Sequence, residues 1–220
     1  MRVVIAGGHG KIALRLEKLL AEGGHEVVGL VRNPDHVPEV RATGAAAEVV
    51  DLEASSVDTV AGPLTGADAV VFAAGAGQGS SAERKDTVDR AAAVLLADAA
   101  VAAGVPRYVL VSATGVDREP DPDRGEVWAA YVRAKKAAED QVAERPIALT
   151  VLRPGPLTDD PGVGRVALAP PALDRTAVTR DDVAAVLVGL LVEPRGVNPV
   201  LDLMGGDTPI DDAVAAAVRA

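Results

Sequence analysis

Tyr131 and Lys135 stand four residues apart in the stretch AAYVRAKKAAED, which otherwise has the composition of a charged helix. Residues at this spacing are neighbours on a helix, so the lysine ammonium would lie close to the phenol. A nearby positive charge favours the phenolate and lowers the pKa of a tyrosine, which would allow the pair to exchange protons with a reacting oxygen. The same spacing occurs on ordinary solvated helix faces, so the rest of the chain must decide between the two interpretations.

The elements that must position this pair alternate between strand-like and helix-like segments. Apolar runs rich in β-branched residues are each followed by segments rich in Ala, Leu and charged residues, as in alternating strands and helices. Strands are predicted at 2–7, 26–31, 47–52, 68–75, 107–113, 148–155 and 199–206. Helices are predicted at 11–23, 55–62, 83–103, 126–144, 179–194 and 209–220. The tyrosine and lysine therefore fall on the helix that follows the fifth strand.

Strands this apolar, with helices between them, need parallel pairing, right-handed crossovers and helices over both faces of the sheet. We therefore predict an α/β fold with a doubly wound, mostly parallel sheet, formed by residues 1–220 as a single domain. Aromatic residues make up only 2% of the chain, so Val, Leu and Ala must build the core.

The bulk charge of the chain limits its partners. A formal net charge of −10 repels nucleic acid and acidic lipid surfaces, which leaves a small molecule as the expected partner. The chain has no cysteine and shows no signal peptide or long apolar run, so we expect a cytoplasmic protein. Its three histidines lack ligand spacing, and no metal site is expected. The sequence carries no signal for the oligomeric state.

A glycine-rich turn, IAGGHGKIA, joins the first predicted strand to the first predicted helix. Its small residues fit the G-x-G-x-x-A pattern, in which a tight turn lets a pyrophosphate approach bare N–H groups at a helix N-terminus. A tight turn without a ligand would look the same, but the position at the start of a βαβ unit favours a dinucleotide. The predicted cofactor contacts in this turn are Gly7, Gly8, His9, Gly10, Lys11 and Ile12.

The end of the second strand indicates which dinucleotide is bound. NAD-binding proteins usually place a carboxylate there to accept a hydrogen bond from the ribose 2′-hydroxyl, whereas this chain has Arg32 in LVRNP. A guanidinium matches a 2′-phosphate in charge and geometry. We therefore predict NADP(H), held by Arg32 with help from Asn33, and with Lys11 as a weaker candidate. The alternative is an arginine that only faces solvent near the turn.

Further cofactor contacts are predicted from position at the strand ends. Asp51 and Leu52 end the third strand beside the expected adenine, and Ala73, Ala74 and Gly75 end the fourth strand, where small residues let the chain pass close to a ligand. Plain packing at a strand end remains an alternative for each of them.

Three irregular segments follow strands, at 75–82, 114–126 and 154–176. Loops at the carboxyl ends of parallel strands form the ligand crevice, so we expect a small substrate-side region built from 114–126 and 154–176. The acidic segment 114–126 is either a mobile lid or an ordinary surface loop.

The chain as a whole resembles the short-chain dehydrogenase/reductase superfamily of Rossmann-fold proteins. Within it, the chain is similar to the atypical NAD(P)-binding branch related to the nucleoside-diphosphate-sugar epimerases. The resemblance rests on an ordered set of motifs that spans nearly the whole chain, namely GGHGKIA, LVRNP, VVDLEA, VFAAGAG, YVLVSATGVD, YVRAK, LRPGPL and VTRDDVA.

The resemblance implies roles for further residues. The family's catalytic serine, tyrosine and lysine correspond to Ser112, Tyr131 and Lys135, and its fourth catalytic member, an asparagine, corresponds to Asp89. The loop that reaches the nicotinamide corresponds to Pro154, Gly155, Pro156 and Leu157.

Two functional hypotheses remain open. The first is an NADPH-dependent reductase or epimerase-like enzyme that transfers hydride to or from a small carbonyl or alcohol. The second is a module similar to the NmrA-like branch, which senses the NADPH/NADP ratio without turnover.

Overall fold

A nine-stranded sheet runs through the computed structural model, which describes residues 1–77, 79–193 and 199–219. The strand order is β11-β8-β10-β6-β5-β4-β1-β2-β3. The parallel strands are β1 (Arg2–Ala6), β2 (Glu26–Val31), β3 (Ala46–Val49), β4 (Ala69–Phe72), β5 (Arg107–Val111), β6 (Ala148–Pro154) and β10 (Val200–Gly205). Two antiparallel strands, β8 (Arg165–Ala169) and β11 (Thr208–Pro209), form one edge of the sheet. The predicted doubly wound, mostly parallel α/β fold is confirmed.

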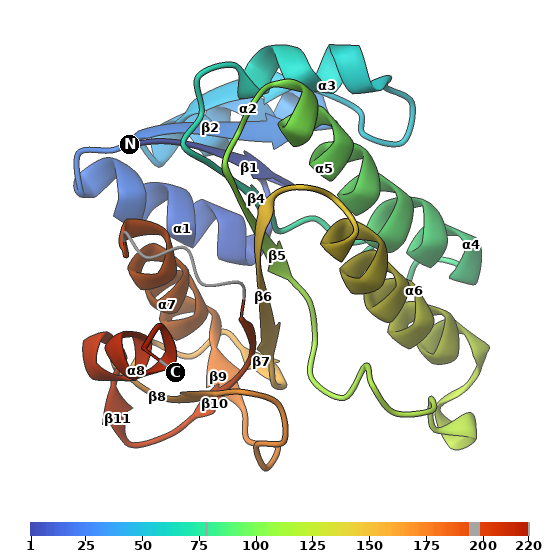
Figure 1. Cartoon of the computed structure of the whole chain (residues 1–220), viewed down its shortest axis with the longest axis vertical. Coiled ribbons are helices and arrows are strands. Elements are labelled where there is room, and N and C mark those ends of the chain that lie inside the picture. The colour runs from blue at the N-terminus through green and yellow to red at the C-terminus, as the bar shows by residue number, and fades with distance from the viewer. Residues whose placement is uncertain (78, 194–198, 220) are drawn as a thin grey trace.

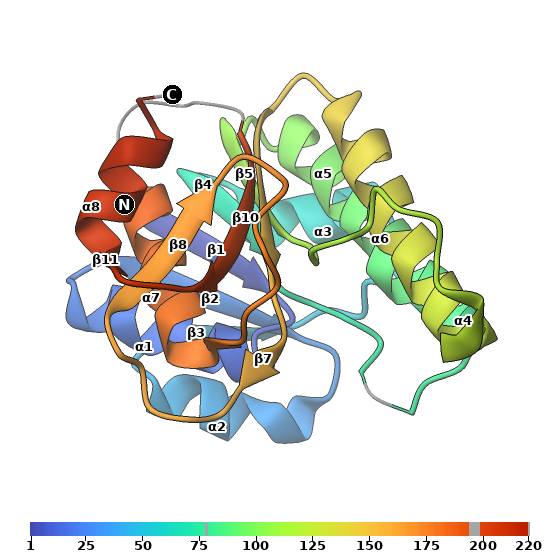
Figure 2. The ribbon, with the colours of Figure 1, turned by 90° about the horizontal axis from the view of Figure 1, so that it is seen from below.

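Helices cover both faces of the sheet (Figure 1). One layer contains α1 (Lys11–Glu22), α7 (Arg180–Val192) and α8 (Ile210–Ala217), and the other contains α3 (Val57–Leu64), α5 (Ala92–Ala102) and α6 (Glu126–Ala143). Figure 2 shows the same two layers from below. The short helix α2 (Val37–Ala42) follows β2.

The core divides into two clusters because side chains alternate along each strand. In β1, Val3 and Ile5 pack under α1 and α7, whereas Val4 and Ala6 pack under α3 and α5. Both faces of the central strands are therefore apolar, which explains their nearly continuous hydrophobic runs.

The segment 154–176 was expected to be irregular, and this expectation is wrong because the segment contains strands. It holds β7 (Leu157–Thr158) and β8, and β7 pairs with β9 (Val178–Thr179). The β8 strand exists because it pairs antiparallel with β10. This pairing spans more than thirty residues of sequence, so the local Pro-rich composition does not reveal it.

Other boundaries also differ from the predictions. The helix predicted at 83–103 consists of α4 (Ala82–Arg84), a π-helical turn (Lys85–Ala91) and α5. The strand predicted at 47–52 ends at Val49, so Asp51 and Leu52 lie in the following turn. Some predicted positions lie outside the described residues. These are the last residues of two predicted helices, 194 and 220, and residue 78 of the segment 75–82.

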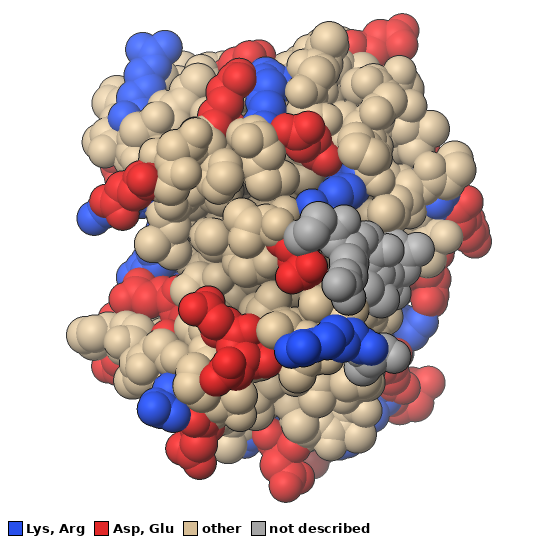
Figure 3. All heavy atoms as spheres, turned by 60° about the vertical axis from the view of Figure 1, so that its left-hand side comes forward, with Lys and Arg blue, Asp and Glu red and all other residues tan. Residues whose placement is uncertain are grey.

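The charges on the surface are mixed. On the face shown in Figure 3, acidic and basic side chains are interspersed, so the net charge is not gathered into one patch there. Within residues 1–77, 79–193 and 199–219, no helix has the length and apolar character needed to cross a bilayer.

A buried acid, Glu17, lies beneath the glycine-rich turn. Its side chain points from α1 toward β2, where a Cβ on Gly29 would lie 2.5 Å from Glu17 Oε1. The Thr43 hydroxyl donates to Glu17 Oε2 at 3.4 Å, while Oε1 has no hydrogen-bond partner among the described residues. Burial raises the pKa of Glu17 to about 8, so the carboxyl is protonated at neutral pH.

We predict that Glu17→Gln stabilises the protein at pH 8 but has little effect at pH 5. In the unfolded chain Glu17 ionises near pH 4.5, whereas in the folded protein it holds its proton to about pH 8. Wild-type stability therefore falls as the pH rises between these values, and the amide variant avoids that loss. Urea unfolding at pH 8 should show a gain on the order of a few kcal/mol.

The exposed Glu48→Gln substitution on β3 is the control, and it should change the free energy of unfolding little at either pH. An equal effect of Glu17→Gln at pH 5 and pH 8 would contradict a protonated Glu17.

Candidate active site

The glycine-rich turn leaves bare backbone at the N-terminus of α1. Gly7 has a φ of +80°, and a Cβ there would lie 2.6 Å from Ala74 Cα at the end of β4. Gly10 precedes α1 without a side-chain cap, and the first turn of the helix has no acidic residue. The N–H groups of Gly8 and Gly10 donate to the Leu30 and Gly7 carbonyls, so the amide groups open to an anion are those of the first turn of α1, where the positive end of the helix dipole also favours negative charge. The turn fits the pyrophosphate of a dinucleotide.

A cavity of about 360 Å³ lies beside this turn, over the carboxyl ends of β1, β2 and β4 and the turn after β3. Most of the predicted cofactor residues line it, namely Gly7, His9, Gly10, Arg32, Asn33, Asp51, Leu52, Ala73, Ala74 and Gly75. The structure therefore brings together residues from four separate segments of the chain in one hollow.

Three residues of the predicted turn do not line this cavity. Gly8 packs against Gly29, and Ile12 packs on the core under α1. Lys11 does not line the cavity, and its ammonium lies 2.5 Å from Asp159 Oδ2. Contact of Lys11 with a 2′-phosphate stays a prediction.

Two arginines converge on one carboxylate at the wall of the cavity. Glu53 Oε2 lies 2.7 Å from Arg32 Nη1 and 2.6 Å from Arg84 Nη2, and Glu53 Oε1 accepts from the Thr87 hydroxyl at 2.7 Å. The hydrogen bond from Arg84 holds the pKa of Glu53 below its usual value. Sequence reasoning missed Glu53 and Arg84. Arg84 is 52 residues away from Arg32 in the sequence, and no local pattern marks it.

A buried ion pair lies next to the cavity. Lys135 Nζ lies 3.4 Å from Asp89 Oδ1 and donates to the Val111 carbonyl at 3.1 Å, and both charged side chains are almost fully buried. Asp89 Oδ2 also accepts from the backbone N–H of Ala76, a cavity residue, at 3.2 Å. The predicted Lys135 and Asp89 are therefore in contact, and they join α6 to the cavity wall.

Asp89 reaches this position from an irregular helical turn. The segment Lys85–Ala91 is π-helical, a conformation often found at functional sites. Lys85, on the same turn, is also buried and donates to the Gly77 carbonyl at 2.8 Å. Its ammonium lies 5.4 Å from the centre of the Tyr131 ring. The sequence analysis missed Lys85 because nothing in its local context separates it from a solvated helical lysine.

Tyr131 lies on α6 one turn before Lys135, but its ionisation differs from the expectation. Burial, together with the Asp89 carboxylate, raises the pKa of Tyr131 above its usual value. We predicted that Lys135 would lower it. That prediction is wrong in this structure, because burial of the phenol is the larger effect and the Asp89 carboxylate acts in the same direction. Tyr131 is therefore a neutral phenol.

Ser112 follows β5 directly and is buried. Its backbone N–H donates to the Leu152 carbonyl at 2.8 Å, which continues the pairing of β5 with β6. Its hydroxyl has no hydrogen-bond partner among the described residues. A buried hydroxyl usually has a partner, so Ser112 Oγ has an unused capacity for a hydrogen bond.

The predicted nicotinamide loop continues from the carboxyl end of β6. Gly155 donates its N–H to the Leu203 carbonyl at 2.8 Å, and a Cβ on Gly155 would lie 2.5 Å from Met204 Sδ. The Thr114 N–H donates to the Pro154 carbonyl at 3.1 Å, which links this loop to the segment after Ser112. Leu157 begins β7 and is partly exposed. Contact of these residues with a nicotinamide stays a prediction.

The described part of the chain contains no group of three His, Asp or Glu side chains that could hold a metal ion. None of the four predicted catalytic residues lines the cofactor cavity, and Asp89 is joined to it through the Ala76 N–H; the four are Ser112, Tyr131, Lys135 and Asp89.

Comparison with known proteins supports this interpretation of the cavity. A family model described as NAD(P)H-binding matches residues 7–194. The uncharacterized sugar epimerase YhfK of Bacillus subtilis is 33% identical over 97% of this chain and 99% of its own length.

Solved structures share the fold. A structure from Bacillus halodurans, named as an NAD-dependent epimerase/dehydratase, is 33% identical, has a TM-score of 0.89 and is matched over 98% of this chain and 99% of its own. The anaerobilin reductase ChuY of Escherichia coli O157:H7 is 23% identical with a TM-score of 0.80, over 94% of this chain and 98% of its own, which shows the shared fold. Together with the glycine-rich turn and its cavity, these matches show that the chain belongs to the NAD(P)H-binding family of Rossmann-fold, epimerase-like oxidoreductases.

Proposed function

We propose that the protein is an NADP(H)-dependent oxidoreductase that transfers hydride to or from a small carbonyl or alcohol substrate. The observation that carries this proposal is the buried Asp89–Lys135 pair, which joins the wall of the cofactor cavity to the helix that holds Tyr131. Lys135 also contacts the carbonyl directly before Ser112, so the helix with the phenol and the strand end with the unpaired hydroxyl are both tied to this pair.

The two arginines at Glu53 support NADP(H) over NAD(H). Arg32 and Arg84 line the same cavity, and both place guanidinium nitrogens on one carboxylate oxygen. A 2′-phosphate carries more charge than a carboxylate and accepts several such hydrogen bonds at once. Glu53 holds the two guanidinium groups in place in this structure, and Arg32 and Arg84 are the residues that would bind the phosphate.

The bound cofactor would supply or accept a hydride at a carbon of the substrate, and the chain supplies the accompanying proton. In the reducing direction, the neutral phenol of Tyr131 donates its proton to the carbonyl oxygen as the hydride reaches the carbon, giving an alcohol. Its raised pKa keeps the phenol protonated at neutral pH. The Ser112 hydroxyl, which has no other partner among the described residues, orients the substrate oxygen.

The buried pair has a positioning role in this scheme. Lys135 donates to the Val111 carbonyl, directly before Ser112, and lies one helical turn after Tyr131. It therefore fixes the distance between the strand end that carries the hydroxyl and the helix that carries the phenol. Asp89 balances the charge of the lysine, and its carboxylate adds to the effect of burial in raising the pKa of the tyrosine.

We predict that Arg32→Asp together with Arg84→Ala reduces NADPH affinity by about 10- to 100-fold, because one or two charge-assisted hydrogen bonds are lost. NADH affinity should change little. Binding of both dinucleotides by calorimetry measures the difference. Arg41→Asp, an exposed arginine of α2 outside the cavity, is the control for net charge. A ratio of NADPH to NADH affinity that stays at the wild-type value would refute the assignment of the 2′-phosphate site.

We predict that Tyr131→Phe lowers NADPH-dependent reduction by about 100- to 10,000-fold while NADPH binding is retained, because a general acid is removed. Loss of NADPH absorbance with a panel of quinones, aldehydes and ketones measures the rate. Tyr108→Phe is the matched control, because Tyr108 is fully buried and donates to the Ala93 carbonyl away from the site.

Equal rates for wild type and Tyr131→Phe would exclude Tyr131 as the acid. Tight NADPH binding by the wild type without turnover of any compound in the panel would instead support the second hypothesis, a sensor of the NADPH/NADP ratio.

A further inference from the structure

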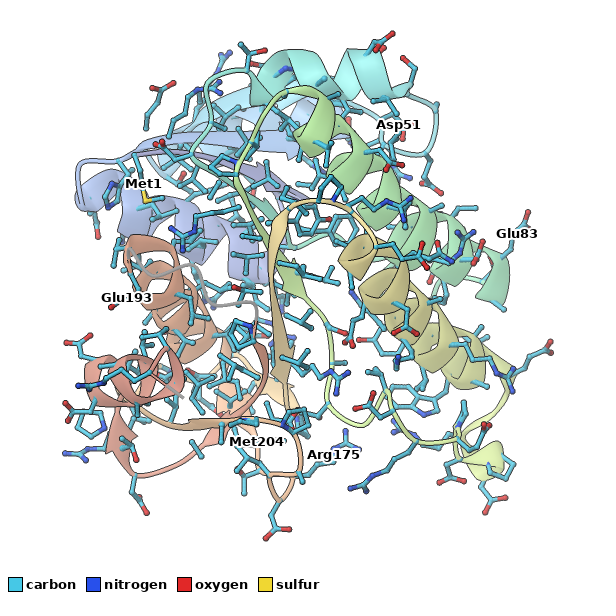
Figure 4. All side chains as sticks on the ribbon, viewed as in Figure 1. Met1, Asp51, Glu83, Arg175, Glu193 and Met204 are labelled. Carbon is cyan, nitrogen blue, oxygen red and sulfur yellow. The ribbon has the colours of Figure 1, made fainter. Side chains whose placement is uncertain are left out.

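A second cavity of about 360 Å³ lies on the α6 side of the sheet and shares no lining residue with the cofactor cavity. Its walls come from residues 114–118 after β5 and 171–175 after β8, and its floor is formed by Arg153 of β6 and Asp202 of β10. In Figure 4, Arg175 lies at the lower edge of the molecule, next to the carboxyl-terminal strands.

Three polar side chains form a row across neighbouring strands and connect this cavity to the proposed site. In the strand register, Arg153 of β6 lies opposite Asp202 of β10. Val111 of β5 lies opposite Leu152, so the next residue, Ser112, lies beside Arg153. The residues two positions before the members of the row all pack on the side of the sheet covered by α3, α5 and α6; they are Leu110, Val151 and Val200. The side chains of the row therefore point to that same face. Since adjacent strands are about 4.8 Å apart, Asp202 and Ser112 are separated by roughly 10 Å.

Asp202 is buried and incompletely bonded. Its Oδ2 accepts from the backbone N–H groups of Ala172 at 3.1 Å and Leu173 at 3.4 Å, while Oδ1 has no partner among the described residues. Only 5% of the side chain is exposed. A buried carboxylate oxygen without a donor costs free energy, so a missing O–H or N–H group is expected at this position.

The neighbouring arginine does not supply that donor. Arg153 directs Nε to Glu139 Oε1 at 2.9 Å, and its Nη2 contacts both Glu139 and Asp117, the latter at 3.0 Å. Its remaining guanidinium nitrogen also contacts Asp117. Four N–H groups of the guanidinium are thus directed to two carboxylates, and none of these hydrogen bonds goes to Asp202.

Two arginines without ion-pair partners stand on the rim of this cavity. Arg118 and Arg175 are both exposed and line it, and neither has an ion-pair partner in the described parts of the chain. Asp117 and Asp174 line it as well, and Asp117 is paired with the buried Arg153. A ligand that places a hydroxyl at Asp202 could therefore place an anionic group at the two arginines.

We propose that this cavity is the distal subsite of the substrate and selects a hydroxylated carbonyl compound that carries a carboxylate or phosphate. Asp202 accepts a hydrogen bond from a substrate hydroxyl, Arg118 and Arg175 hold the anionic end, and the reacting oxygen lies at Ser112. This inference rests on the proposed function, because it assumes that Ser112 marks the reacting end.

Direct binding tests the subsite without relying on turnover. Gluconate, glucose 6-phosphate and neutral glucose are titrated calorimetrically into the protein saturated with NADP⁺. We expect the two anions to bind and glucose to bind at least about tenfold more weakly. Asp202→Asn should weaken anion binding by about tenfold, because one acceptor is replaced by a donor.

Two further variants separate the roles of the residues. The double variant Arg118→Ala with Arg175→Ala should abolish the preference for the anions over glucose. Asp174→Asn removes the same charge as Asp202→Asn from the same cavity but should not weaken anion binding. NADPH affinity and the thermal midpoint of each variant show whether it is folded, and both should stay near the wild-type values.

The absence of saturable binding for both anions, or equal binding by wild type and Asp202→Asn, would overturn the subsite. If NADPH binding and Tyr131-dependent turnover of other carbonyl compounds persist in that case, only this inference fails. Anion binding that depends on Asp202 and the two arginines, without any turnover, would support the subsite while the proposed hydride transfer fails.

Discussion

The buried ion pair between Lys135 and Asp89 is the interaction on which the rest of the site depends. Both side chains are withdrawn from water, at 6% and 1% exposure, with 3.4 Å between ammonium and carboxylate. Removal of either partner would leave an uncompensated buried charge, which typically costs about 3 to 5 kcal/mol. The pair also uses the Val111 carbonyl and the Ala76 N–H, so four segments of the chain converge on it. The placement of α6 relative to the cofactor cavity follows from this convergence.

Burial and the same pair together determine the protonation of the site. Burial of the phenol is the larger cause of the raised pKa of Tyr131, and the Asp89 carboxylate adds to it. The phenol is therefore neutral and carries the proton that the reduction of a carbonyl consumes, although its raised pKa makes it a weaker acid than a free tyrosine. The row formed by Ser112, Arg153 and Asp202 crosses the sheet, so the Ser112 hydroxyl and the proposed distal subsite share one face.

Features encoded by neighbouring residues could be predicted from the sequence. The glycine-rich turn and the apolar strands reveal the fold and most of the cofactor cavity, because the required small residues are adjacent in the chain. Arg32 could be predicted because it directly follows the second strand. Glu53, Arg84 and Lys85 were missed because their importance arises only when separate segments pack together. Asp202 could not be found either, since its missing hydrogen bond is a property of three-dimensional packing. The strand β8 was missed because it forms by pairing with distant β10.

A crystal structure of the protein with NADPH tests the central claim most directly. The account predicts the pyrophosphate at the N-terminus of α1, the 2′-phosphate against Arg32 and Arg84, and the nicotinamide ring beside the hydroxyl groups of Ser112 and Tyr131. A nicotinamide ring that points away from Tyr131, or a ribose 2′-phosphate without contact to either arginine, would contradict it.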